Sequence, residues 1–154
     1  MQNLIPTSYL KAAVLVLMTF FCTTMACSAS ELTWHTDMKK AQQIAAKKEK
    51  HVLINFTGSD WCPWCVKLDA NVFSTSEFAE FAAKELVLVK IDFPRKEQLN
   101  QEQAAANERL AKRYRVRGFP TLIILNSQGE RLGSTGFRQE SANNYIEHLQ
   151  GMME

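Results

Sequence analysis

Short apolar runs that alternate with amphipathic stretches constrain the fold of this 154-residue chain more than any other feature of its sequence. Runs of roughly four to eight apolar residues are typical of buried strands, whereas apolar residues spaced at i, i+3 and i+4 indicate helices. Strands are predicted at 32–35, 52–56, 86–93, 121–125 and 131–135, and helices at 37–50, from about 63, at 74–84, 97–114 and 141–153. This order predicts an α/β protein with a mixed, largely parallel central sheet and helices on both faces.

The first thirty residues differ from the rest of the chain. Lys11 is the only charged residue before Glu31, and an almost wholly apolar run over residues 12–26 is followed by the small residues of CSAS at 27–30. This pattern predicts a secretory signal peptide over residues 1–30, cleaved after residue 29 or 30, and a folded domain over residues 31–154. Two alternatives stay open: a lipoprotein attached through Cys27, and an uncleaved membrane anchor.

Composition narrows the choice of partners and compartment. The net charge of +2 is too small to predict binding to nucleic acid, and the content of 46% hydrophobic and 22% charged residues is that of an ordinary globular domain, which we expect to be monomeric. Removal of the leader takes Cys22 and Cys27 with it and leaves Cys62 and Cys65. An export signal combined with a lone C-x-x-C pair predicts a redox-managed compartment outside the cytoplasm, the periplasm.

The two remaining cysteines allow three interpretations. A structural zinc ion needs four ligands, and none of His35, His51 and His148 lies near the pair in sequence, so no metal is expected. A permanent disulfide that closes so short a loop would remove little entropy from the unfolded chain. A reversible redox pair is the interpretation that these residues favour.

The position of Cys62 just ahead of a predicted helix explains how it would react. Pro63 suits the first helical position, where its missing N–H costs no hydrogen bond. Free N–H groups and the helix dipole stabilise a thiolate at Cys62, and the thiolate is the nucleophile of thiol chemistry. Cys65, one turn deeper, is placed to resolve a mixed disulfide. Trp61 and Trp64 give the surrounding surface an aromatic character.

Two segments resemble the thioredoxin superfamily, and the resemblance extends over about residues 32–153. W-C-P-W-C at 61–65 is similar to the W-C-x-x-C active site, and L-A-K-R-Y-R-V-R-G-F-P-T-L at 110–122 is similar to the segment that leads to the family's cis-proline. The resemblance implies a thioredoxin fold with a cis bond before Pro120, a substrate groove in which the backbone of Phe119 pairs with an extended segment, and Gly136 at its border. The nearest subfamily is that of small exported oxidoreductases of the DsbH type.

The resemblance implies a protein-disulfide oxidoreductase that needs no organic cofactor. Cys62 would attack, Cys65 would resolve, and the groove would be formed by Trp61, Pro63, Trp64, Phe119, Pro120 and Gly136. Expected partners are disulfide-containing exported proteins and a membrane thiol protein that donates electrons. Because Trp64 supplies no charge beside the thiolate, we expect a reductase rather than a strong oxidant. An oxidase or isomerase, and a binding or chaperone module without turnover, are the alternatives.

Some residues depart from the family pattern or have a second interpretation. Asn55 falls nearest to the family's buried aspartate but cannot act as a base, and Lys90 falls out of register with the family's lysine. S-T-S-E at residues 74–77 predicts a capping box with Ser74 as the N-cap. A basic cluster precedes Pro120, and we interpret it as a solvated helix face rather than as a site for an acidic partner; it comprises Arg109, Lys112, Arg113, Arg115 and Arg117.

Overall fold

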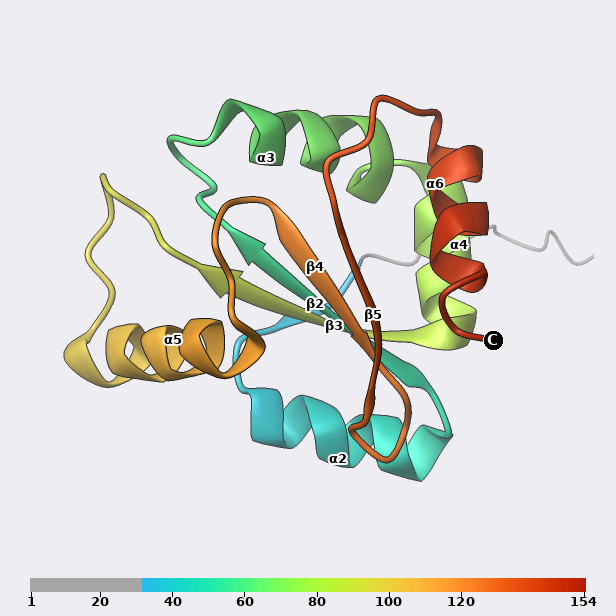
Figure 1. Ribbon diagram of the computed structural model, residues 1–154, viewed down its shortest axis with the longest axis horizontal. Helices are drawn as coiled ribbons and strands as arrows, with labels where there is room; N and C mark the ends of the chain where they lie inside the picture. Colours follow the sequence, from blue (N-terminus) through green and yellow to red (C-terminus); the bar gives the residue numbers. More distant parts are fainter. Residues whose placement is uncertain (1–31) are drawn as a thin grey trace, which may run out of the picture.

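The computed structural model describes residues 32–154, so the predicted leader lies outside the described residues. These residues form one five-stranded mixed sheet with helices on both faces (Figure 1). The elements in chain order are β1 (Trp34–His35), α2 (Met38–Lys48), β2 (His51–Thr57), α3 (Pro63–Leu68), the π-helix η1 (Asp69–Phe73), α4 (Ser76–Glu85), β3 (Leu86–Asp92), α5 (Gln101–Tyr114), β4 (Thr121–Leu125), β5 (Arg131–Gly136) and α6 (Ala142–Gln150).

The strand order β1-β3-β2-β4-β5 is that of a mixed sheet, as predicted, with a smaller parallel share than expected. β3 pairs in parallel with β1 and β2, whereas β4 runs antiparallel to both β2 and β5. Antiparallel pairing of β2 with β4 sets Phe56 opposite Thr121, so the end of β2 and the start of β4 meet at one edge of the sheet. The segments that follow β2 and precede β4 are thereby brought together.

Two apolar layers enclose the sheet. One layer joins Leu53 and Leu88 of the sheet to Leu68 of α3, Phe78 of α4 and Tyr145 of α6. The other joins strand residues to the helices α2 and α5, which lie together on the opposite face (Figure 1). Because successive strand residues face opposite ways, each central strand contributes to both layers, and this explains why the strands read as continuous apolar runs.

The face of the sheet beneath α3 becomes polar near the site. Leu53 of β2 and Leu88 of β3 belong to the layer that contains α3. Two-residue alternation places the side chains of Asn55 and Lys90 on that same face, one step closer to the strand ends. Asn55 is buried, with 6% of its surface exposed. Asn55 is therefore buried beside α3, whereas the Lys90 side chain is partly exposed.

The predicted capping box at α4 is wrong by one residue. The N-cap is Thr75, whose hydroxyl oxygen accepts the N–H of Phe78, and Ser74 instead ends the preceding π-helix, where its N–H donates to the carbonyl of Asp69. The extra residue in the π turn carries Ser74 into the first helix, so it is not free to begin the second. Phe73 and Phe78 do pack together, with ring centroids 4.9 Å apart. No helix within residues 32–154 is long and apolar enough to cross a membrane.

Candidate active site

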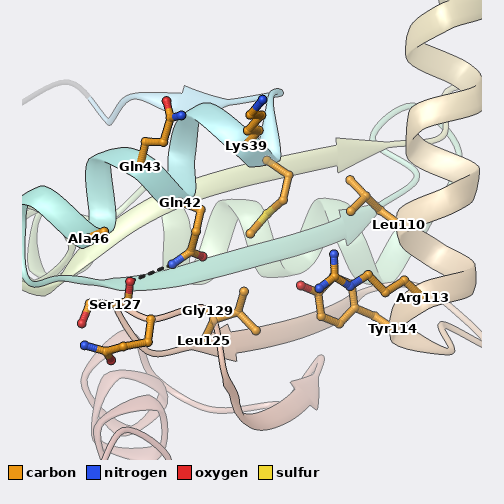
Figure 2. Close-up of a pocket in the computed structure, with 12 residues that line it drawn as sticks. Lys39, Gln42, Gln43, Ala46, Leu110, Arg113, Tyr114, Leu125, Ser127 and Gly129 are labelled. Carbon is orange, nitrogen blue, oxygen red and sulfur yellow. Dashed lines mark hydrogen bonds between the residues drawn. The ribbon is translucent and has the colours of Figure 1, made fainter.

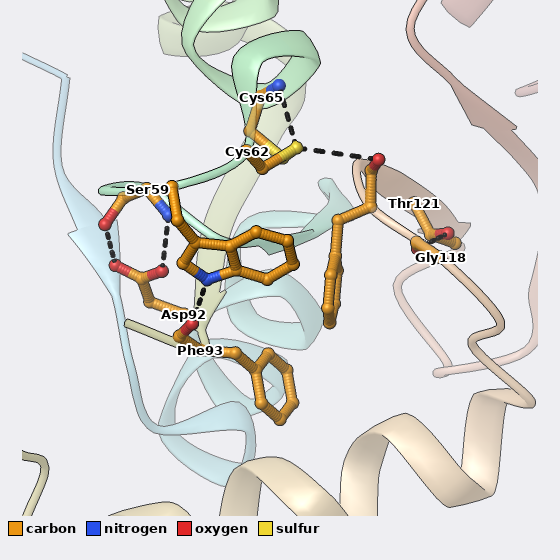
Figure 3. Close-up of a disulfide and its surroundings, with 9 residues drawn as sticks. Ser59, Cys62, Cys65, Asp92, Phe93, Gly118 and Thr121 are labelled. Atoms are coloured by element: carbon orange, nitrogen blue, oxygen red, sulfur yellow. Dashed lines mark hydrogen bonds between the residues drawn. A yellow bond between two sulfur atoms is a disulfide. The ribbon is translucent and has the colours of Figure 1, made fainter. Parts of the chain in front are cut away.

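Cys62 and Cys65 form a disulfide at the N-terminus of α3 (Figure 3). Cys62 is the N-cap and Pro63 is the first helical residue, as the sequence predicts. The Cys65 N–H points at Cys62 Sγ, 3.2 Å away, and this contact with the sulfur atom favours negative charge there once the pair is reduced. Both cysteines are nearly buried, with 4% and 5% of their surfaces exposed.

The segment before β4 forms the second side of the site. The Phe119–Pro120 bond is cis, in agreement with the expectation for Pro120. The Phe119 carbonyl oxygen lies 3.6 Å from Cys62 Sγ (Figure 3), and a reduced Cys62 thiol can donate to it. Gly136 borders this segment so closely that a Cβ atom there would lie 3.0 Å from the Pro120 carbonyl oxygen. The antiparallel pairing of β2, β4 and β5 thus gathers predicted residues from three parts of the chain.

Aromatic side chains form two platforms beside the disulfide. The Trp61 platform consists of Trp61, Phe93 and Phe119. The ring centroid of Phe119 lies 5.8 Å from that of Trp61 and 5.1 Å from that of Phe93. The Trp64 platform consists of Trp64 and Phe137, whose centroids are 5.0 Å apart. Trp64 is 51% exposed, although large apolar side chains are usually covered. Such exposed apolar surface around a reactive group is typical of a binding site.

Trp61 is held in place by its neighbours. Its indole Nε1 donates a hydrogen bond to the Phe93 carbonyl oxygen at 2.7 Å. Gly58 leaves room for the ring, because a Cβ atom at that position would lie 2.5 Å from the indole. The orientation of Trp61 therefore depends on the loop that follows β3 as well as on residues 58–62, which we call the active-site loop.

Hydrogen bonds join the active-site loop to residues 93–96, which we call the 93–96 loop. Asp92 accepts both the backbone N–H and the hydroxyl of Ser59 (Figure 3). Asp60 accepts the backbone N–H groups of Lys96, at 2.6 Å, and Arg95, at 3.0 Å, and the Lys96 bond is the main cause that lowers the pKa of the Asp60 carboxyl. These bonds place the Arg95 guanidinium 3.8 Å from the centre of the Trp61 ring.

A cavity of about 230 Å³ lies on the other side of the disulfide, beneath α3. Cys65 and Asn55 both line it, and Asn55 Oδ1 is buried without a hydrogen-bond partner. Lys90 lines the same cavity and is the register partner of Asn55, although it was not named as a site residue from the sequence. The remaining lining residues are Trp34, Thr57, Ser59, Val66 and Asp69. A polar cavity of this size can hold water next to Cys65.

Sequence reasoning missed Lys90, Arg95 and Asp60. Lys90 and Asn55 each interrupt an otherwise apolar strand, a signal visible in the sequence, and each is the fifth residue of its strand. Nothing in the sequence reports the contact of Arg95 with Trp61, because it depends on how two loops separated by more than thirty residues bond to each other.

Other parts of the structure lack the reactive groups of this site. A groove of about 700 Å³ lies between α2, α5 and the β4–β5 turn (Figure 2), lined by residues such as Lys39, Gln42 and Arg113 and by neither cysteine. The basic cluster of the sequence contributes Arg113 to this groove, remote from the disulfide. Residues 32–154 contain no group of three or more His, Cys, Asp or Glu side chains that could hold a metal ion.

The model of a thioredoxin-like domain matches residues 38–150, which is most of the chain. The chain belongs to the thioredoxin-like family. A relative of this thioredoxin-like protein, disulfide bond reductase DsbH from Chlamydia pneumoniae, is 32% identical over 127 residues, which cover 82% of this chain and 76% of DsbH. A solved structure of a DsbH oxidoreductase matches with a TM-score of 0.78 at 32% identity, covering 86% of this chain and 92% of that one.

A further relative is larger. The thiol:disulfide interchange protein DsbD from Pasteurella multocida is 29% identical over 128 residues, which cover 81% of this thioredoxin-like chain but only 20% of DsbD. The Cys62–Cys65 disulfide and these relatives together establish a DsbH-like thiol–disulfide oxidoreductase.

Proposed function

We propose that the protein is an exported reductase of protein disulfides. The observation that carries this proposal is the Cys62–Cys65 pair at the start of α3, separated only by Pro63 and Trp64 and facing the Phe119 carbonyl beside Pro120. The 32% identity to a protein named disulfide bond reductase supports the same direction of electron flow.

The first step forms a mixed disulfide. The Cys62 thiolate attacks one sulfur atom of the substrate disulfide, the substrate S–S bond breaks, and the released substrate sulfur takes up a proton. The N-cap position favours the thiolate, because the Cys65 N–H and the start of the helix face Cys62 Sγ. The substrate segment extends along the Phe119–Pro120 backbone, between the Trp61 and Trp64 platforms and beside Gly136.

The second step releases the reduced substrate. The Cys65 thiol loses its proton and attacks Cys62 Sγ, which expels the second substrate sulfur as a thiolate and restores the Cys62–Cys65 disulfide. Two electrons pass in total from the dithiol to the substrate. Because position 55 holds an asparagine, which cannot act as a base, the proton of Cys65 must pass to water entering the cavity or to the Asp69 carboxylate that also lines it.

The direction follows from the charges around Cys62. A thiolate stabilised strongly by an adjacent positive charge makes a disulfide oxidising. The residues between the cysteines carry no charge, and the cations on the two platforms, Arg95 and Lys67, are exposed and screened by solvent. A moderately stabilised thiolate therefore leaves the dithiol a useful electron donor.

The reduction potential of the Cys62–Cys65 couple tests the proposal. We expect a value between about −200 and −270 mV, measured by equilibration with glutathione buffers and counting of free thiols. Trp64→His should raise the potential, because the added cation sits beside the thiolate. A potential above about −150 mV would contradict the reductase and favour the oxidase or isomerase. Substrate binding that survives loss of both cysteines would instead favour a binding or chaperone module.

Export rests on the leader pattern at residues 1–30. An exported reductase has no access to cytoplasmic reductants, so a membrane thiol protein should return electrons to the pair. The intact mass of the protein recovered from the periplasm should correspond to a start near Ser30 or Glu31. A mass that includes residues 1–26 would indicate a membrane anchor instead.

A further inference from the structure

We infer that this reductase selects disulfides whose cysteine lies in an extended segment with an apolar residue flanked by acidic side chains. The inference rests on the proposed function and names the substrate class of the same site. It follows from the charges at the two aromatic platforms: the acidic groups there accept hydrogen bonds within the protein, whereas Arg95 and Lys67 lie on the aromatic rings without an ion pair.

Three carboxylates around the two platforms have partners within the protein, whereas Asp69 faces the cavity beneath α3. Asp60 accepts the backbone N–H groups of Arg95 and Lys96, and Asp92 accepts two hydrogen bonds from Ser59. These carboxylates keep their negative charge, and Asp60 interacts with the Lys96 ammonium, but within residues 32–154 neither Arg95 nor Lys67 forms an ion pair. Glu140, in the loop after Phe137, pairs with Arg138.

The cations at the rim are free to meet a ligand. Within residues 32–154, the only ion pairs join Lys90 to Asp92 and Arg138 to Glu140. Arg95 and Lys96 are exposed at the edge of the Trp61 platform, and the Lys67 ammonium lies 4.8 Å from the centre of the Trp64 ring. Each platform therefore carries at least one unpaired positive charge on or beside an aromatic face.

The arrangement fits a segment with two kinds of side chain. An apolar residue next to the substrate cysteine can cover Trp64, whose exposed ring gains from burial. Carboxylates on either side of it can reach Arg95 and Lys96 at one platform and Lys67 at the other. Because these cations are exposed, their contribution appears chiefly in the association rate and in its dependence on salt.

Three peptides test the inference. Each contains one cysteine and the same apolar neighbour, is joined through a disulfide to thionitrobenzoate, and differs only in flanking residues: Glu, Gln or Lys. The protein, purified after expression of the full chain and pre-reduced, releases the coloured thiol in a single turnover. We expect rate constants in the order Glu, Gln, Lys, with about a three- to tenfold span at low salt that shrinks at about 0.5 M salt.

Variants connect the preference to the named cations. Arg95→Gln and Lys96→Gln together should at least halve the ratio of the Glu-peptide rate to the Lys-peptide rate, whereas Arg95→Lys should keep it. Ratios within one variant cancel any general loss of activity. Arg109→Gln removes the same charge from an exposed position of α5 and serves as the control, with an unchanged ratio.

Different results would contradict the acidic preference and the reductase activity. Equal rates for the three peptides, or a ratio that survives loss of Arg95, Lys96 and Lys67, overturn the acidic preference and leave the reductase intact. Hydroxyethyl disulfide, which carries no flanking residues, reports the chemistry alone. If neither hydroxyethyl disulfide nor any peptide is reduced, both the reductase function and the acidic preference are contradicted.

Discussion

At the scale of single residues, Cys62 and Cys65 differ in surroundings although both are nearly buried. Cys62 Sγ faces the Phe119 carbonyl and the aromatic platforms, whereas Cys65 lines the cavity beneath α3. Cys65→Ser should therefore accumulate mixed disulfides with substrate proteins, because nothing resolves them, and Cys62→Ser should accumulate far fewer. Non-reducing gels of both variants measure this, and the reverse pattern would exchange the two roles.

Asn55 gives a second prediction at this scale. Asn55→Asp places a carboxyl group in the cavity that Cys65 lines, and an ionised carboxylate there disfavours the Cys65 thiolate. We expect the pKa of Cys65 to rise, measured by the pH dependence of alkylation in a Cys62→Ser background. Asn126→Asp, at the β4–β5 turn, is the matched control. An unchanged Cys65 pKa in Asn55→Asp would mean that a charge at residue 55 does not affect the ionisation of Cys65.

The residues of the site divide by how far the sequence could predict them. Cys62 and Cys65 form a local motif whose spacing is informative in itself, and Pro120 was predictable from the resemblance of residues 110–122 to the thioredoxin superfamily. The interruption of two apolar strands at Asn55 and Lys90 was visible but has meaning only once the strands are known to be neighbours. Arg95 was not predictable, because its place depends on hydrogen bonds between two loops.

At the scale of elements, the start of α4 shows where local patterns are ambiguous. S-T-S-E offers three hydroxyl residues as the N-cap, and the π-helix before it decides in favour of Thr75. Thr75→Ala should lower the free energy of unfolding by about 1 kcal/mol, because the Phe78 N–H loses its acceptor. Urea denaturation measures the change. Ser74→Ala should cost less than about 0.5 kcal/mol, and equal losses would contradict this cap.

At the scale of the whole molecule, strand directions were harder to predict than strand positions. The alternation of elements indicates which segments form strands and that a helix crosses between them, and both predictions are confirmed. The same alternation suggests parallel neighbours, but β4 returns antiparallel to β2 because the chain re-enters the sheet from the side of the active site. This direction depends on the segment 115–120, which the hydrophobic pattern does not describe.

Tyr145 links β5 to α6 and gives the molecule a pH-dependent stability. Its hydroxyl donates to the Gly136 carbonyl oxygen at 2.7 Å, and burial raises its pKa above the ordinary value. The unfolded chain loses the Tyr145 proton near pH 10 while the folded protein retains it, so the free energy of unfolding falls as the pH rises above about 10.

Tyr145→Phe removes this dependence. The wild-type protein should lose about 0.8 kcal/mol relative to the variant between pH 8 and pH 10.5, measured by urea denaturation of the oxidised form. Tyr114, on the other face of the sheet, is present in both proteins, so its ionisation cancels in the comparison. A difference between the two proteins that stays constant over this range would contradict the assignment.

The bonds from Asp60 to the 93–96 loop also make backbone amides into reporters. The N–H groups of Arg95 and Lys96 belong to exposed residues, yet both donate to the Asp60 carboxylate. Their hydrogens exchange with deuterated solvent only when those bonds open, so their protection from exchange gives the free energy of opening the contact between the two loops. Comparison of these two amides in the oxidised, reduced and substrate-trapped forms would show how the stability of this contact changes between those forms without any label on the protein.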